Sequence, residues 1–127
     1  MATGLLRLAA LSGKREYEQQ AEGVLRLYAK PAAQHPDAFA HLLRALDFHL
    51  SPTKEVALVG DDLSDLAGVV RGAYRPHIVL AGGPEGAETP ELLQARTKVN
   101  GESAAYVCEH FTCKAPVTSP QALSDLL

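Results

Sequence analysis

Two short apolar runs that each end in glycine most constrain the fold of this chain. The runs are EVALVGD, residues 55–61, and HIVLAGG, residues 77–83. A continuous apolar run of this length, bounded by glycine, is typical of a strand whose two faces are both covered. We therefore predict two buried strands.

The segments around these runs predict helices and one more strand. Residues 62–74 have apolar side chains at helical spacing, residues 91–97 are long enough for about two turns of helix, and residues 103–108 form a third apolar run. Ser119 and Pro120 suit the start of a last helix. Alternating strands and helices favour parallel strands with right-handed crossovers. We predict an α/β domain at residues 53–127, with a small three-stranded parallel sheet and flanking helices in a Rossmann-like three-layer arrangement.

Residues 1–52 have the pattern of three amphipathic helices. The apolar stripe of the second helix consists of Tyr17, Ala21, Val24, Leu25 and Tyr28, and that of the third consists of Phe39, Leu42, Leu43, Leu46 and Leu50. We expect Pro31 and the PAAQHP stretch, residues 31–36, to end the second helix. Three helices before so small a sheet either pack on one of its faces or belong to a larger helical assembly. In the second case their exposed apolar faces would let the chain form homo-oligomers.

Composition excludes several classes of protein. The 127 residues are 46% hydrophobic and 21% charged, as in a globular domain, and the net charge of -3 argues against a nucleic-acid binder. No apolar run approaches the roughly 20 residues of a membrane span, and no signal peptide is recognisable. We expect a cytoplasmic protein without a nucleic-acid or membrane partner.

The two cysteines, Cys108 and Cys113, leave three interpretations open. An extended chain would hold their Cα atoms about 16 Å apart, so a disulfide requires a turn within EHFT, which contains no strong turn former. A zinc site would need a fourth ligand such as His77 beside the two cysteines and His110. In the simplest alternative Cys108 ends a buried strand, His110 faces solvent, and no metal binds.

The strand ends are the other candidate site. Ligands of open parallel sheets bind beyond the carboxyl ends of the strands. That edge would gather a polar, glycine-lined rim made of Gly60, Asp61, Asp62, Gly82, Gly83, Glu109 and His110. Neither a dinucleotide fingerprint nor a phosphate loop follows the first strand, so we expect no cofactor. Capping and turn formation are the structural alternative for these residues.

The terminal block AAYVCEHFTCKAPVTSPQAL resembles the C-terminal region of the YyaL and spermatogenesis-associated thioredoxin-domain-containing protein family. The segments LLRLAALSGKREYEQQAEGVL, FAHLLRALDFHL and KEVALVGD are similar to the family as well. The resemblance implies an upstream thioredoxin-like domain and an α/α toroid similar to N-acylglucosamine 2-epimerases and six-hairpin glycosidases. Residues 1–52 would then be the tail of the toroid, and the upstream domains would be the partners of residues 53–127.

Three functions follow from the resemblance. The first is a non-catalytic module that packs against the helical toroid and has no enzymatic activity alone. The second is a thiol-disulfide redox role of Cys108 and Cys113 toward the thioredoxin-like domain. The third is a part in a sugar epimerase-like enzyme, which rests on fold analogy alone.

Overall fold

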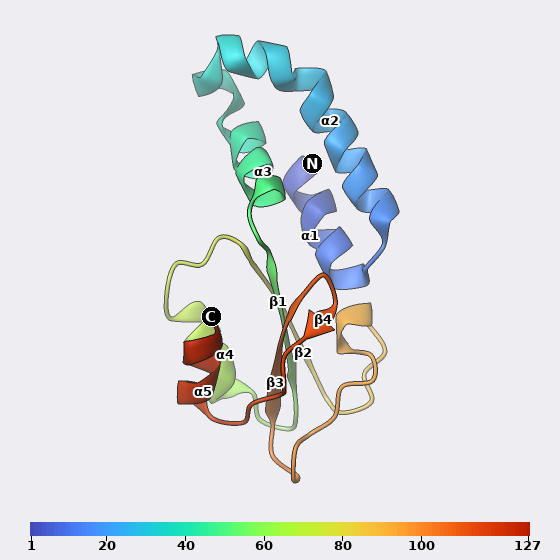
Figure 1. Cartoon of the computed structure of the whole chain (residues 1–127), viewed down its shortest axis with the longest axis vertical. Coiled ribbons are helices and arrows are strands. Elements are labelled where there is room, and N and C mark those ends of the chain that lie inside the picture. Colours follow the sequence, from blue (N-terminus) through green and yellow to red (C-terminus); the bar gives the residue numbers. More distant parts are fainter.

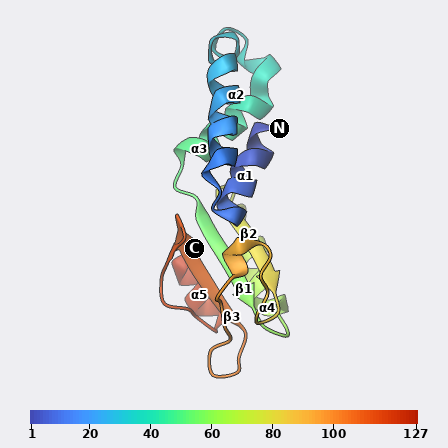
Figure 2. The ribbon, with the colours of Figure 1, turned by 90° about the vertical axis from the view of Figure 1, so that its right-hand side faces the viewer.

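The computed structural model describes all 127 residues and arranges them as a helical layer above a sheet layer (Figure 1). The helical layer contains α1 (Ala2–Ser12), α2 (Arg15–Gln34), the 3-10 turn η1 (Pro36–Phe39) and α3 (Ala40–Leu50). Seen from the side, the molecule is long and narrow, with α1, α2 and α3 at one end (Figure 2).

The three predicted helices are present, and the second ends within the predicted stretch of residues 31–36, although not at Pro31 itself. Helix α2 continues through Pro31 to Gln34, and the N–H of His35 still donates to the Pro31 carbonyl at 2.9 Å. A proline removes only one donor and usually bends a helix instead of ending it when tertiary packing holds both sides. Ala32, one residue after the proline, is buried and provides that packing.

The sheet has four strands in the order β2-β1-β3-β4. They are β1 (Lys54–Val59), β2 (Ile78–Gly83), β3 (Ala104–Glu109) and β4 (Thr112–Cys113). Strands β1 and β2 are parallel and are joined by α4 (Ser64–Arg71), as predicted. The prediction of three parallel strands was wrong, because β3 runs antiparallel to β1 and β4 runs antiparallel to β3.

The connection between β2 and β3 explains the antiparallel direction. A parallel crossover needs an element that returns the chain across the sheet, usually a helix. The predicted helix at residues 91–97 is only the three-residue 3-10 turn η2 (Glu91–Leu93). The chain therefore stays at the edge where β2 ends, and β3 begins there, with Ala104 paired to Val59.

Different elements cover the two faces of the sheet. Helices α4 and α5 (Pro120–Leu126) cover one face, where Leu66, Val70 and Leu123 pack against Val56, Leu58, Ala105 and Val107. The η2 turn covers the other face, where Leu92 and Leu93 pack against Ala57, Val59 and Ala81. The predicted cap of α5 is confirmed, since the Ser119 hydroxyl accepts from the Ala122 N–H at 3.2 Å.

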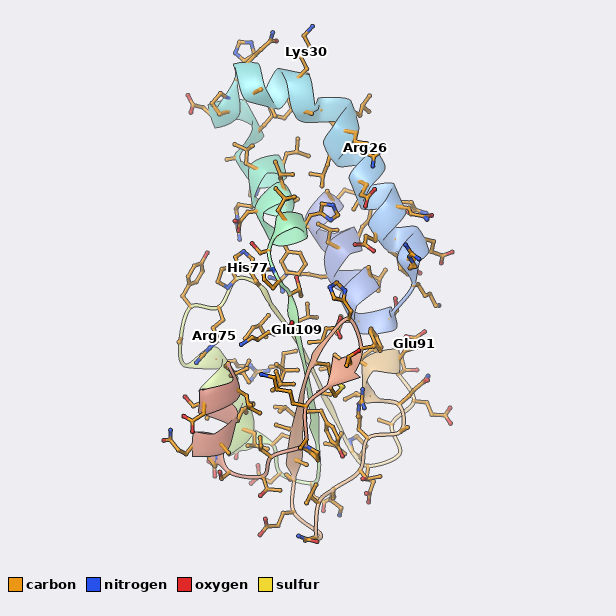
Figure 3. All side chains as sticks on the ribbon, viewed as in Figure 1. Arg26, Lys30, Arg75, His77, Glu91 and Glu109 are labelled. Atoms are coloured by element: carbon orange, nitrogen blue, oxygen red, sulfur yellow. A yellow bond between two sulfur atoms is a disulfide. The ribbon has the colours of Figure 1, made fainter.

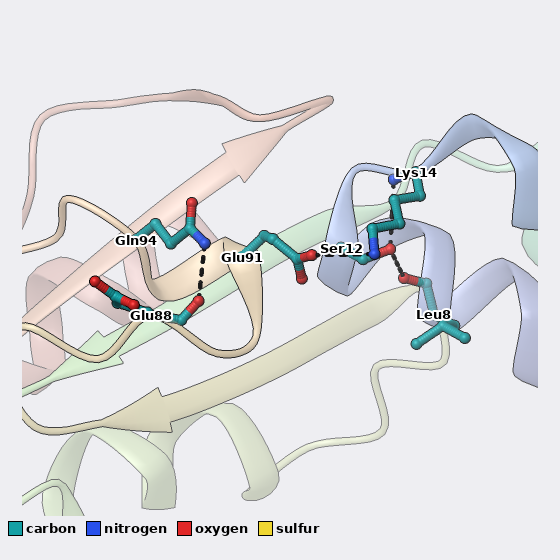
Figure 4. Close-up of polar contacts among 6 residues, drawn as sticks. All are labelled: Leu8, Ser12, Lys14, Glu88, Glu91 and Gln94. Carbon is teal, nitrogen blue, oxygen red and sulfur yellow. Dashed lines mark hydrogen bonds and ion pairs between the residues drawn. The ribbon is translucent and has the colours of Figure 1, made fainter.

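The helical and sheet layers share their cores. Val79 of β2 belongs to the core of the helical layer, and Leu11 of α1 packs against both cores. Arg7 donates to the carbonyl groups of Pro76 and Ile78. The Lys14 ammonium, between α1 and α2, lies 3.5 Å from the Glu91 carboxylate on η2 (Figure 4). None of the helices is long and apolar enough to cross a membrane.

Candidate functional site

The β3–β4 hairpin brings the two cysteines together as a disulfide. Cys108 and Cys113 face each other across the hairpin with their Cα atoms 3.9 Å apart. The turn consists of His110 and Phe111, whose φ angles of 49° and 61° are both positive. Two positive φ angles match the twist of a two-residue hairpin, and such turns usually contain Asn or Gly. The turn was therefore not predictable from residue preferences.

Contacts outside the hairpin hold this unfavourable turn in place. The Phe111 N–H donates to the Glu55 carboxylate at 2.7 Å. The Phe111 ring lies against Gly13 at the junction of α1 and α2, where a Cβ would approach the ring to 3.2 Å. His110 is exposed, as the simplest alternative for the cysteines predicted. The tip of the hairpin thus connects the sheet to the helical layer.

Arg96 lies beside the disulfide. Its Nη2 is 2.9 Å from the Cys113 sulfur and 3.9 Å from the Cys108 sulfur. The guanidinium also lies 5.2 Å from the centre of the Tyr106 ring. The Tyr106 hydroxyl donates to the Thr97 carbonyl at 2.9 Å, which holds the segment that carries Arg96.

Arg96 has no anionic partner. It belongs to none of the five ion pairs of the chain, and its buried Nε has no hydrogen-bond partner. Arg96 is half-buried, and a charge that is partly removed from water is usually paired with a carboxylate. The positive charge beside the two sulfurs is therefore available for an anion.

Glu55 lies next to Cys108, on the neighbouring strand β1. It pairs with Cys108 in the β1–β3 register, so the two side chains share a face of the sheet. It is 4% exposed, and this burial raises the pKa of Glu55 above its ordinary value. The Phe111 N–H and the charges of His110 and Arg96 lower that pKa, the charge of Glu109 raises it, and the pKa of Glu55 stays raised overall.

A cavity of about 690 Å³ lies between the hairpin tip and the helical layer. Glu55, His110 and Phe111 line it from the sheet side. The ionisable groups on the helical side are Lys14, Arg15, Glu18 and His49. Glu55 is thus buried in the protein but borders a space that water can enter.

The structure separates the predicted strand-end rim into two groups. At one end of the strands, where β1 and β2 finish, lie Gly60, Asp61, Asp62, Gly82 and Gly83. Glu109 and His110 lie at the opposite end, where β3 finishes. Figure 3 shows Glu109 near the helical layer. The seven residues therefore do not form one rim, because β3 is antiparallel and its carboxyl end points away from the ends of β1 and β2.

The first group has structural contacts. Asp61 pairs with Lys98 at 3.0 Å, and this hydrogen bond raises the pKa of Lys98. Asp62 accepts from the hydroxyl and the N–H of Ser64 at the start of α4, and these bonds lower the pKa of Asp62. Leu63 and Leu93 pack against the positions where Gly82 and Gly83 lack side chains.

The considered zinc ligands are not brought together as one set. The two cysteine sulfurs are bonded to each other. His77 directly precedes β2, and its Nε2 lies 2.6 Å from the Asp47 carboxylate. Figure 3 shows His77 between the helical layer and the sheet.

Two members of the cysteine site were missed in the sequence. Glu55 could have been found, because a carboxylate that begins an otherwise apolar strand is exceptional. Arg96 had no signal, since it lies in an irregular loop whose path depends on the Tyr106 contact and on the positive φ of 57° at Ala95.

Comparison with known proteins confirms the resemblance found in the sequence. The chain is 28% identical to Spermatogenesis-associated protein 20 of Homo sapiens, 27% identical to that of Rattus norvegicus and 26% identical to that of Mus musculus. Each match covers 99% of this chain but only 17% of the relative's length. No family model and no solved structure matches the chain. The chain is thus homologous over almost its whole length to Spermatogenesis-associated protein 20, and the match is consistent with a C-terminal region of that family.

Proposed function

We propose that this chain is a non-catalytic α/β module of a larger protein, in which it packs against a helical domain through α2 and α3. The main support is an apolar groove between these helices, of about 370 Å³. Its apolar lining includes Leu25, Ala29, Leu42, Leu43 and Leu46. An exposed apolar groove of this kind suits an amphipathic helix whose apolar face lies in it.

The length of the relatives supports a partner within a larger protein. The chain spans 17% of their length, so the remainder is long enough to contain a helical domain. The family resemblance implies that this domain is an α/α toroid preceded by a thioredoxin-like domain. Burial of the groove by such helices would stabilise the assembly by roughly 25 cal/mol for each Å² of apolar surface removed from water.

Sedimentation of the isolated chain tests the proposal. With the groove uncovered, the chain should self-associate as its concentration rises, and Leu43→Glu with Leu46→Glu should return it to a monomer. Both leucines are partly exposed, at 38% each, so the glutamates can reach solvent and the fold should persist.

The matched control is Leu27→Glu, on α2 but outside the groove and 71% exposed, which should leave self-association unchanged. Circular dichroism checks that all variants are folded. A chain that stays monomeric at every concentration would contradict a docking role for this groove.

The disulfide supports a second function, a reversible thiol-disulfide redox site formed by Cys108 and Cys113. The specific observation is the unpaired Arg96 guanidinium beside both sulfurs, since a nearby cation stabilises a thiolate and thiolates carry out disulfide exchange. No comparable observation favours the sugar epimerase-like alternative.

Titration with mixtures of reduced and oxidised dithiothreitol tests this function. The disulfide of the folded chain should open and re-form reversibly, as followed by alkylation of the free thiols and mass spectrometry. A chain that reacts only after urea has unfolded it would show that the disulfide is structural.

A further inference from the structure

The two sulfurs of the disulfide have different access to solvent. Cys108 is 1% exposed in the interior of the sheet, whereas Cys113 on the edge strand is half-buried. A thiolate breaks a disulfide by attacking one sulfur in line with the bond, so access decides which sulfur it reaches. The geometry therefore favours attack at Cys113.

Arg96 distinguishes the same two sulfurs. The Arg96 Nη2 lies 1.0 Å closer to the Cys113 sulfur than to the Cys108 sulfur, at 2.9 Å against 3.9 Å. In the disulfide these sulfurs are neutral, and the guanidinium has no carboxylate partner. Reduction would place the negative charge of a thiolate on Cys113, the sulfur nearest to the Arg96 guanidinium. An adjacent arginine lowers the pKa of a thiol and makes it a better leaving group.

Glu55 distinguishes Cys108. It is the residue opposite Cys108 in the register, on the same face of the sheet. Because burial keeps its carboxyl protonated to higher pH, Glu55 can give a proton to a sulfur that leaves in the interior. The cavity that Glu55 borders lets water replace that proton. The other titratable groups around Glu55 are Arg96, His110, Glu109, Lys14, Arg15, Glu18 and His49.

We propose that the disulfide exchanges with a dithiol in a fixed order, with Cys113 as the attacked sulfur and Cys108 as the leaving sulfur. This order rests on the redox function proposed above and specifies its substrate class and the roles of Arg96 and Glu55.

Both steps balance. In the first, one thiolate of the dithiol attacks the Cys113 sulfur, the Cys108–Cys113 bond breaks, and the electron pair moves to Cys108, which takes a proton from Glu55. In the second, the other thiolate of the dithiol attacks the dithiol sulfur that is bonded to Cys113. This closes a disulfide within the former dithiol and releases Cys113 as a thiolate beside Arg96. Two electrons pass to the protein, the dithiol becomes a disulfide, and water returns the proton to Glu55.

Single-cysteine variants test the order directly. Iodoacetamide alkylation of the folded chain is measured as a function of pH for Cys108→Ser and for Cys113→Ser. The remaining Cys113 thiol should titrate below the ordinary value of about 8.5. It should react at least tenfold faster than the remaining Cys108 thiol, because only Cys113 is accessible.

Substitution of Arg96 tests the role of the positive charge. In the Cys108→Ser background, Arg96→Gln should raise the pKa of the Cys113 thiol by about one unit or more, whereas Arg96→Lys should retain much of the depression. A merely structural arginine would leave this pH profile unchanged. Circular dichroism identifies any variant that fails to fold.

Substitution of Glu55 tests the proton. Glu55→Gln retains an oxygen that can accept from the Phe111 N–H but has no proton to transfer. Dithiothreitol should reduce the disulfide of this variant severalfold more slowly at the pH values where Glu55 is protonated, with a changed pH profile of the rate. The exposed Glu88→Gln should react like the unsubstituted chain.

The outcomes separate this inference from the redox function on which it rests. Equal alkylation of both thiols, or faster alkylation of Cys108, would overturn the order while reversible reduction still supported redox function. A disulfide that dithiothreitol cannot open in the folded chain would overturn both.

Discussion

Glu55 is the only ionisable acid or base among the 24 buried residues of the chain. Its carboxyl group accepts a hydrogen bond from the Phe111 N–H at the hairpin tip. A neutral amide side chain could accept the same hydrogen bond, whereas a glutamate is ionisable. The acid therefore makes the stability of the fold depend on pH.

That dependence has a definite sign. Burial raises the pKa of Glu55 above its ordinary value of 4.5, so the folded chain keeps a proton that the unfolded chain releases. The free energy of unfolding should therefore fall as pH rises from about 4.5 through the raised pKa. Each tenfold difference in proton affinity corresponds to about 1.4 kcal/mol.

Glu55→Gln should remove this loss, because glutamine does not titrate. Urea unfolding at pH 4.5 and pH 7.5 measures the effect, and the variant should gain stability relative to the unsubstituted chain as pH rises. Glu88→Gln, at an exposed position, is the matched control and should show no such gain. A constant difference between Glu55→Gln and the unsubstituted chain at the two pH values would contradict the assignment.

At the scale of elements, the end of β1 and the start of β3 meet at Gly60. Its φ is +153°, and a Cβ there would lie 2.7 Å from the Ser103 Cα. The Ser103 hydroxyl donates to the Asp62 carbonyl at 2.7 Å, which fixes the close approach. No side chain fits between the two strands at this point.

Gly60→Ala should therefore destabilise the fold by about 3 kcal/mol, because the added methyl group meets backbone that cannot move. Gly86→Ala is the matched control, since Gly86 also has a positive φ of 83° but has open space around it. It should cost only about 1–2 kcal/mol of backbone strain. Urea unfolding compares the two, and equal losses would show that the contact with Ser103 has no separate effect.

At the scale of the whole molecule, the helical and sheet layers should unfold as one unit. Val79 in the helical core, Leu11 against both cores and Phe111 against Gly13 connect the layers from both sides. A domain boundary near residue 52 remains a prediction from the sequence pattern and the family resemblance. Shared cores of this kind favour a single cooperative transition.

Hydrogen exchange during urea unfolding tests this cooperativity. Amides of α3 and of β3 should lose protection at the same urea concentration. Arg7→Ala, which removes the hydrogen bonds to Pro76 and Ile78, should lower both midpoints together. Protection that persists in β3 after α3 has unfolded would instead support two independent domains.

The sequence determined the elements whose signals are local. Apolar runs ended by glycine predicted β1 and β2, the apolar residues at helical spacing predicted α1 to α4, and Ser119-Pro120 predicted the start of α5. Of the three strands that were expected to be parallel, only β1 and β2 are, and they are joined by a helix as predicted. The cysteines were found, but their pairing was not, because a turn of His110 and Phe111 has no favourable local preference.

Tertiary contacts decided the direction of β3 and the composition of the site. The direction depended on η2 packing its leucines on the sheet instead of extending into a crossover helix. The site depended on three segments distant in sequence: Glu55 stabilises the turn, the turn pairs the cysteines, and Tyr106 holds the loop that places Arg96 beside them. Periodicity reports which residues are buried, whereas strand direction and charge placement depend on contacts between residues far apart in the chain.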